Sequence, residues 1–433
     1  MYLGASFKGH QKLVAMGKNK SVIVVGGGIV GLSTAYFLQK AGHRVTVLEK
    51  SDISSGASFV NAGYLTPSHI VSLASPGMIT KGLKYMFNSS SPFYMKPRLD
   101  PDFIRWAWYF KKSATQTKVE RSMSVIRDIN LLSRELYEGI QASGDLGDFQ
   151  IGNQGLMMVY QTEKARDHEM EVVEKAAKMG LVGKHLSKSA LKKIEPNVDF
   201  NAEGAILWEC DRHTTPPIIM KRMVEYLEKA GVDIHKNEGV TDVSLSNGKV
   251  TGITTEKASY KADEVVFAAG SWTSELSKKL SLKLPLQAGK GYRINVEEPT
   301  NITIPAILME KKIAVTPMEG FTRFAGTMEF SGINHTIRKE RVEAIARGVE
   351  TYYNGLQIPE EAKNNAKCGL RPVSPDGLPY IGKPKNIHNL TIATGHAMMG
   401  WSMGPATGKL VTELISVDKL SMDISPFATE RKF

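Results

Sequence analysis

The segment SVIVVGGGIVGLSTAYFLQKAGHRVTVLEK, residues 21–50, constrains the fold more strongly than any other part of the sequence. Its apolar run VIVV predicts a short buried strand, and the spacing Gly26-x-Gly28-x-x-Gly31 follows at once. A helix is expected over residues 29–40, and RVTVLE predicts a second strand after it. This order of strand, glycine turn, helix and strand is typical of a doubly wound α/β sheet that binds a dinucleotide.

The three glycines suit the pyrophosphate of such a ligand. The first permits the sharp turn, the second lets the backbone approach the phosphates, and the third lets the helix pack on the strand. The helix N-terminus would direct unpaired N–H groups and a partial positive charge toward the phosphates. Glu49 ends the second strand, 18 residues after Gly31, where an acid accepts hydrogen bonds from a ribose. An acid at this position disfavours NADP, so FAD and NAD remain.

A second glycine-rich turn, GHAMMGWSMGPATGKLVTELI at residues 395–415, also leads into a helical pattern. Between the two turns, residues 240–272 predict two strands and then the buried strand EVVFAAG, which returns the chain to the first sheet. An extended FAD would use both turns. Its pyrophosphate would lie on the first helix, and the second helix N-terminus would stabilise the negative charge that the isoalloxazine gains on reduction. The methionines of the second turn are also typical of core packing.

Composition excludes several classes of protein. The length of 433 residues predicts two or three domains, and Cys210 and Cys368 are too few and too far apart for a disulfide framework or a metal site. Cysteine usage favours a reducing cytoplasm. The net charge is +11, but the sequence has no nucleic-acid recognition motif. We therefore expect a solvated basic surface and no binding of nucleic acid. Residues 1–19 lack the apolar core of a signal peptide and are expected to form a disordered extension.

Seven motifs together resemble the FAD-dependent D-amino-acid oxidase superfamily, and within it the bacterial D-amino acid dehydrogenase group. They are VVGGGIVGLSTAYFLQKAGHRVTVLEK, SGASFVNAGYLTPSH, SPGMITKGLKYMF, GNQGLMMVY, PLQAGKGYRI, GLRPVSPDGLPYIG and TGHAMMGWSMGPATGKLVTELI. The similarity runs from about Ser21 to Phe433.

The resemblance implies a mixed α/β fold with two main domains. One is a Rossmann-like FAD-binding domain of the glutathione-reductase type, and the other is a substrate domain with an antiparallel sheet. The FAD-binding domain would combine 20–75, part of 150–280 and 365–433; a mostly helical insertion would occupy 76–145, and the substrate domain would take 285–364 with part of 150–210.

The resemblance also implies oxidative deamination of a D-amino acid. Hydride would pass from Cα to flavin N5, the imino acid would hydrolyse to a 2-oxo acid, and electrons would leave to a quinone or another carrier. An oxidase of glycine, sarcosine or D-proline that uses O2, a D-hydroxyproline dehydrogenase and a non-catalytic FAD-binding scaffold subunit are the alternatives, with a nicotinamide dehydrogenase as a weaker one. The accepted side chain stays open among D-alanine-like, D-proline and hydroxy-D-proline substrates, and the sequence does not predict the oligomeric state.

Three residues are candidates for substrate contact. Arg371, in the proline-rich stretch CGLRPVSPDGLPYIG, would hold the substrate α-carboxylate by resemblance; the alternative is a structural arginine. Tyr292 in GKGYRI is a candidate for the pocket over the flavin, or a packed strand residue. His213, in the polar loop ECDRHTTP, would approach the active site as in relatives, or be merely solvated.

A larger set of residues is predicted to contact FAD. The FAD is expected to be bound non-covalently, because Cys368 lies one residue from the position at which some relatives attach the flavin. The set is Gly26, Gly28, Ile29, Val30, Gly31, Glu49, Lys50, Asn61, Ala62, Gly63, Val240, Ala269, Gly270, Gly395, His396, Gly400, Trp401, Ser402 and Met403. No metal is expected.

The stretch 96–121 combines five aromatic residues with seven basic and three acidic residues. Such a composition suits a membrane surface, but it suits an aromatic helix packed on the protein with a basic outer face better. We therefore expect a cytoplasmic protein and leave peripheral contact with the inner face of the cytoplasmic membrane open.

Overall fold

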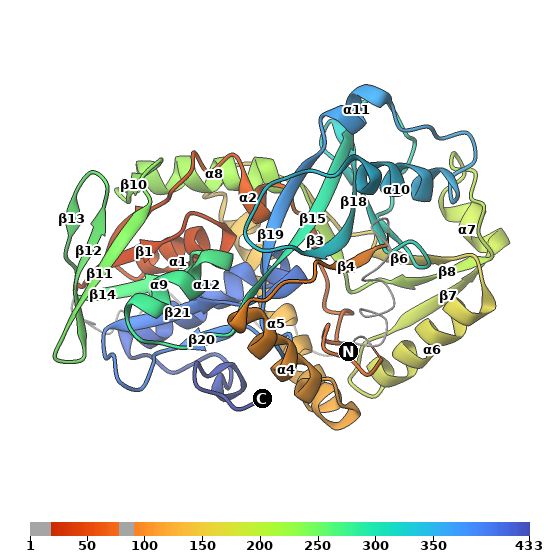
Figure 1. Cartoon of the computed structure of the whole chain (residues 1–433). Coiled ribbons are helices and arrows are strands. Elements are labelled where there is room, and N and C mark those ends of the chain that lie inside the picture. The colour runs from red at the N-terminus through yellow and green to blue at the C-terminus, as the bar shows by residue number, and fades with distance from the viewer. Residues whose placement is uncertain (1–18, 78–90) are drawn as a thin grey trace.

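A computed structural model describes residues 19–77 and 91–433 (Figure 1). Most of the predicted extension at 1–19, and all of the motif SPGMITKGLKYMF after Gly77, lie outside the described residues. Two large sheets dominate the remainder, one on each side of the molecule as drawn. The mixed α/β class is confirmed. The proposed domain boundaries stay a prediction.

The first large sheet has six strands. Their order is β10 (Asp233–His235), β2 (Arg44–Leu48), β1 (Ser21–Val25), β14 (Glu264–Phe267), β21 (Leu390–Thr394) and β20 (Tyr380–Gly382). Every neighbouring pair is parallel except β20 with β21. The strands predicted from VIVV, RVTVLE and EVVFAAG therefore lie side by side, as expected for the doubly wound fold.

Layers on both faces bury this sheet. Val22 and Val24 of β1 share one core with the helices α1 (Ile29–Lys40), α5 (Gln116–Ser143), α8 (Pro216–Lys229) and α12 (Gly400–Ser416). Ile23 and Val25 share another core with β11 (Val240–Ser246), β12 (Lys249–Thr255), β13 (Ser259–Tyr260) and α9 (Thr273–Lys279). Burial on both faces explains why β1 is apolar at every position after Ser21.

The helices α1 and α12 cross in close contact. A Cβ atom added to Gly408 would lie 2.5 Å from the backbone carbon of Ser33, and one added to Gly404 would lie 2.8 Å from Ile29. Two of the four glycines in the second glycine-rich segment therefore serve helix packing.

The second large sheet has nine strands. Eight follow the order β19 (Lys367–Val373), β15 (Gln287–Val296), β18 (Phe321–Phe330), β17 (Ile313–Met318), β16 (Ala306–Leu308), β6 (Leu156–Tyr160), β8 (Gly204–Trp208) and β7 (Gly183–Ser187), and β4 (Phe93–Met95) pairs with β18. The sheet is antiparallel, as predicted, except at the pairs β6–β16 and β4–β18. The helices α10 (Lys339–Glu350) and α11 (Glu360–Asn364) lie near its upper end in Figure 1.

The remaining named elements lie outside the two large sheets and the layers described above. They are α2 (Gly56–Phe59), α4 (Pro101–Ser113), α6 (Glu163–Ala177), α7 (Lys188–Ile194), the small sheet of β3 (Tyr64–Leu65), β9 (Arg212–Thr214) and β5 (Ile151–Gly152), and the 3-10 turns η2 (Gly270–Trp272), η3 (Ala397–Met399) and η4 (Ser425–Phe427). The helix α4 begins where the Asp100 carboxylate accepts hydrogen bonds from the backbone of Asp102 and Phe103.

Candidate functional site

A cavity of about 980 Å³ receives residues from both large sheets. Its lining comes from the turn between β1 and α1, the end of β2, α2, the turn after β14, the strand β19 and the start of α12. Its volume lies at the upper end of the range for ligand sites, as an extended dinucleotide requires.

The first glycine turn is confined by its neighbours. Gly26 has φ +115°, and a Cβ atom there would lie 2.5 Å from the Ala268 carbonyl oxygen. The N-terminus of α1 is satisfied in part from α2, because the Ile29 backbone N–H donates to Ser58 Oγ over 2.9 Å. The turn lines the cavity, and its N–H groups at Gly26, Gly27 and Ile29 already donate within the protein, to Leu48, Glu49 and Ser58.

Glu49 lies where the sequence predicts the ribose-binding acid. Its Oε2 accepts a hydrogen bond from the Gly27 backbone N–H at 2.7 Å, and its Oε1 accepts from the backbone and hydroxyl of Ser51. These three bonds hold the carboxylate in the cavity wall and leave about one acceptor position, because a carboxylate has about four.

The second glycine turn reaches the same cavity. His396 is 2 % exposed, its ring Nε2 lies 2.9 Å from Thr407 Oγ1, and burial lowers its pKa to about 3, so the ring is neutral. The helix α12 begins at Gly400, and Trp401 donates its ring N–H to Thr214 Oγ1. Both helix starts thus face one cavity, which is the arrangement predicted for the two ends of one ligand.

Most of the predicted cofactor residues line the cavity. They are Gly26, Gly28, Ile29, Val30, Glu49, Lys50, Asn61, Val240, Ala269, Gly270, His396, Gly400 and Trp401. The structure places Gly31, Ala62, Gly63, Gly395, Ser402 and Met403 outside this lining. Several of these have packing contacts instead: a Cβ at Gly31 would lie 1.8 Å from the Gly26 carbonyl oxygen, and Ser402 donates its hydroxyl to Asn130.

Arg371 also lines the cavity, from the strand β19. Its Nη1 donates to the Thr327 carbonyl oxygen at 2.7 Å, and no carboxylate pairs with it among residues 19–77 and 91–433. Burial lowers its pKa to about 10, so the guanidinium stays charged at neutral pH. A half-buried cation without a carboxylate partner among the described residues is suited to bind an anionic ligand.

Gly291 supports Arg371 from the neighbouring strand β15. A Cβ atom there would lie 2.2 Å from Arg371 Nη2, so the guanidinium lies directly on the glycine backbone. Thr327, which accepts the Arg371 hydrogen bond, has φ +66° and lies in the irregular register between β15 and β18. Positive φ at a β-branched residue is strained, and such strain gathers at functional sites.

Substitution of Gly291 by alanine should displace the Arg371 side chain. We expect kcat/KM for a carboxylate substrate to fall by about tenfold or more, because misplacement of an orienting group by about 1 Å can cost 10²-fold. FAD content should stay unchanged. Gly252→Ala is the control, since the nearest atoms to a Cβ there lie 3.7 Å away. Unchanged kinetics of Gly291→Ala would contradict a supporting role for this glycine.

The structure does not place Tyr292 or His213 at the cavity. Tyr292 is 1 % exposed, packs in the core of the nine-stranded sheet, and donates its hydroxyl to Glu329 Oε2 at 2.8 Å. His213 is buried against Gly152, where a Cβ would lie 1.9 Å from the ring, and burial lowers its pKa to about 4. The prediction from GKGYRI was Tyr292, whereas the glycine before it, Gly291, makes the contact with Arg371.

Sequence patterns did not single out several residues of the lining. Ser58, Trp272, Arg293, His335 and Lys367 lie in the cavity wall. Arg293 and Lys367 are paired across β15 and β19, so the wall of the nine-stranded sheet is rich in positive charge. The alternation in AGKGYR was the available signal, because residues two apart in a strand share a face. No cluster of His, Cys, Asp and Glu suited to a metal ion occurs in the described part of the chain.

A family model described as FAD dependent oxidoreductase (DAO) matches residues 21–414. The chain belongs to this family. It is 31 % identical to a D-amino acid dehydrogenase of Helicobacter pylori over 91 % of this chain and 94 % of that protein. It is 28 % identical to a D-amino acid dehydrogenase of Agrobacterium fabrum (strain C58 / ATCC 33970), over 95 % and 99 %.

Solved structures share the fold of this FAD-dependent oxidoreductase. Glycine oxidase from Geobacillus kaustophilus superposes with a TM-score of 0.77 at 21 % identity, covering 96 % of this chain and 99 % of that one. L-proline dehydrogenase from P. horikoshii gives a TM-score of 0.71 at 20 % identity, covering 95 % and 97 %. The predicted fold and family are confirmed, and with them an FAD-dependent enzyme.

The cavity fits the cofactor that this family uses. A glycine turn that leaves no room for a Cβ at Gly26, an acid at the end of β2 and a second helix start suit, in order, a pyrophosphate, a ribose and an electron-rich ring. These are different chemical groups of one extended molecule, and the residues that match them line one continuous cavity.

Proposed function

We propose that this enzyme oxidises a D-amino acid at Cα and passes the electrons to a quinone or another carrier. The observation that supports this most directly is the charged, carboxylate-free Arg371 in the same cavity as the predicted cofactor residues. The names of the curated relatives support the substrate class. When bound, FAD supplies an acceptor for the hydride that leaves Cα.

The protein's own residues bind and orient the substrate. Arg371 would hold the α-carboxylate by two parallel N–H···O bonds, with its other contact to Thr327 fixing the plane of the guanidinium. A carboxylate held in this way restricts the orientation of Cα in the cavity, which is the main contribution that positioning makes to rate. The neutral ring of His396 adds no competing charge at the start of α12.

Non-covalent binding of FAD is part of this proposal. Cys368 is 8 % exposed and lines the cavity, where its thiol donates to the His335 carbonyl oxygen at 3.5 Å. Burial raises the pKa of this thiol, so the reactive thiolate is scarce. Acid precipitation should leave the yellow colour in the supernatant; a yellow pellet would show a covalent bond.

The outer face of α4 is our candidate for contact with an anionic membrane surface, where a quinone would be available. Ile104 is 56 % exposed and Trp108 is 55 %, Leu99 just before the helix is 99 % exposed, and Lys111 and Lys112 lie in its last turn. Apolar side chains beside lysines match the two components of interfacial binding. Among the described residues, the helices are all too short or too polar to cross a bilayer.

Binding to lipid vesicles tests this surface. The holoenzyme should sediment with vesicles that contain anionic lipid and less with neutral vesicles or at high salt. The double variant Ile104→Ser, Trp108→Ser should lose most of this binding and keep its flavin. Equal binding of the variant and the wild type would remove α4 from the proposal.

An anaerobic substrate screen tests the function itself. D-amino acids, D-proline and hydroxy-D-proline should bleach the visible flavin absorption, whereas L-amino acids should not. In air, a reduced artificial quinone should accumulate faster than peroxide. Bleaching by glycine or sarcosine with rapid release of peroxide would favour the amine oxidase instead, and no bleaching by any amine would favour a scaffold subunit.

A further inference from the structure

Three side chains from separate parts of the chain are stacked at the rim of the cavity. The Lys50 Nζ atom lies 3.0 Å from the centroid of the Trp272 ring. The His335 ring is stacked on Trp272, with centroids 6.1 Å apart and 14° between the planes. All three residues line the cavity, yet Lys50 and His335 are exposed and Trp272 is half-buried. The stack therefore lies where the cavity meets solvent.

The stack joins the two large sheets. Lys50 follows β2 and Trp272 ends η2, directly after β14, so both belong to loops of the six-stranded sheet. His335 comes from residues 331–338, which connect β18 of the nine-stranded sheet to α10. The contact between His335 and Trp272 thus crosses from one wall of the cavity to the other.

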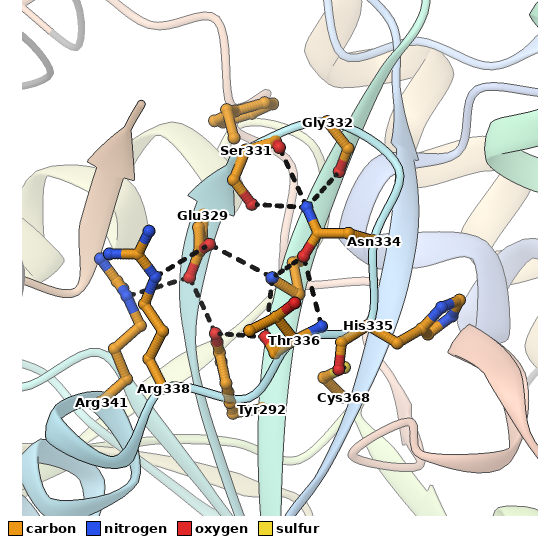
Figure 2. A network of polar contacts seen from close by, with 12 residues as sticks. Tyr292, Glu329, Ser331, Gly332, Asn334, His335, Thr336, Arg338, Arg341 and Cys368 are labelled. Atoms are coloured by element: carbon orange, nitrogen blue, oxygen red, sulfur yellow. Dashed lines mark hydrogen bonds and ion pairs between the residues drawn. The ribbon is translucent and has the colours of Figure 1, made fainter. Parts of the chain in front are cut away.

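Hydrogen bonds from the strands β15 and β19 fix the segment 331–338 (Figure 2). Lys290, which is 1 % exposed, donates from Nζ to Asn334 Oδ1 at 2.6 Å and to the Thr336 carbonyl oxygen at 2.9 Å. The Cys368 thiol donates to the carbonyl oxygen of His335 between them. Because the backbone is bound on each side of His335, the ring is presented at a defined place and loses little further freedom on stacking.

We propose that the stack of Lys50, Trp272 and His335 is a clasp that retains the bound cofactor. Lys50 directly follows Glu49, the predicted ribose acid, and His335 accepts the hydrogen bond of Cys368 on β19, so the clasp spans the rim between these two parts of the cavity. A stacked aromatic pair and an ammonium on an indole both stabilise the closed rim. Departure of the cofactor past this rim requires His335 and Trp272 to separate. The clasp is independent of which amino acid the enzyme oxidises.

The release rate of FAD measures the clasp directly. The holoenzyme is diluted, and the rise in fluorescence of free FAD is followed for the wild type, His335→Ala, Trp272→Leu and the double variant. Each single variant should release FAD about two- to tenfold faster, since an aromatic pair contributes about 0.5–1.5 kcal/mol. The double variant should be little faster than Trp272→Leu, because the two residues act through one contact.

Two controls separate stacking from general damage. His335→Phe retains a ring and should release FAD as slowly as the wild type, and the exposed His388→Ala, outside the cavity lining, should have no effect. His335→Ala should lower the thermal unfolding temperature of the apoprotein only slightly, because it removes one aromatic contact at an exposed residue. Independent, multiplicative effects in the double variant, or fast release by His335→Phe, would overturn the clasp. Neither result bears on the substrate screen, so this proposal and the proposed function fail separately.

Discussion

Replacement of Arg371 by alanine should lower kcat/KM for D-amino acids by about 10²- to 10⁴-fold. Hydrogen bonds to charged groups contribute about 1.5–3 kcal/mol each, and the guanidinium would supply two of them to the substrate carboxylate. The alanine variant should still bind FAD, because the hydrogen bond of Arg371 goes to a backbone carbonyl of the nine-stranded sheet, at Thr327. Steady-state kinetics with several D-amino acids, normalised to flavin content, measure the loss.

Two further variants of this experiment identify the cause. Arg371→Lys keeps the charge but not the planar pair of donors, so it should recover only part of the activity. The exposed Arg121→Gln on α5 is the matched control and should behave as the wild type. The ratio of kcat/KM for an amino acid to kcat/KM for its amide should also be smaller with Arg371→Ala than with the wild type. Full activity of Arg371→Ala would show that the carboxylate is held elsewhere.

Glu329→Gln should destabilise the protein by about 3–5 kcal/mol, the cost of leaving buried charges without their partner. Glu329 is 1 % exposed and lies 3.2 Å from Lys290, 3.0 Å from Arg341 and 3.7 Å from Arg338 (Figure 2). It also accepts the hydroxyl hydrogen bond of Tyr292. Three cationic side chains therefore lie within ion-pair distance of one carboxylate.

Differential scanning calorimetry should show the main unfolding transition lowered by about 5–10 °C. Replacement of the buried partners together, as Lys290→Met, Glu329→Leu and Arg341→Met, should be far less harmful, because it leaves few uncompensated charges. A Glu329→Gln variant as stable as the wild type would show that the cations are already neutralised by other groups.

The pH dependence of this effect has a defined sign. Burial alone would raise the pKa of Glu329, but hydrogen bonds from Ser331 and Tyr292 and the charges of Lys290 and Arg341 hold it below its usual value. A depressed carboxyl pKa contributes stability above the unfolded pKa, about 4.3, and this contribution is lost as the pH falls through the folded pKa. The free energy of unfolding of the wild type should therefore approach that of Glu329→Gln as the pH falls.

Segments with strong local signals were predicted closely. The helix expected over residues 29–40 is α1 at Ile29–Lys40, and the flanking strands are β1 and β2. The seven motifs led to the family that the comparisons confirm. A tight turn needs glycines at fixed spacing, and a strand buried on both faces needs a continuous apolar run. Both patterns are contained within a few consecutive residues, so they can be recognised in the sequence.

Side-chain direction was harder to predict. Tyr292 and Gly291 are adjacent in β15, and a strand turns successive residues to opposite faces. Tyr292 therefore enters the core with Glu329 while Gly291 faces Arg371. Alternation along a strand shows which residues share a face, but it does not identify the face that lines the cavity when both faces are buried.

Local residue patterns were thus sufficient for the doubly wound sheet, the two helix starts and the class of cofactor, since backbone geometry dictates which residues each turn accepts. Long-range packing alone brought Arg371 onto Gly291, His335 onto Trp272 and Lys290 onto Glu329. These contacts join residues that are far apart in the chain. They depend on how two sheets meet, which is a property of the whole folded chain rather than of any segment in it.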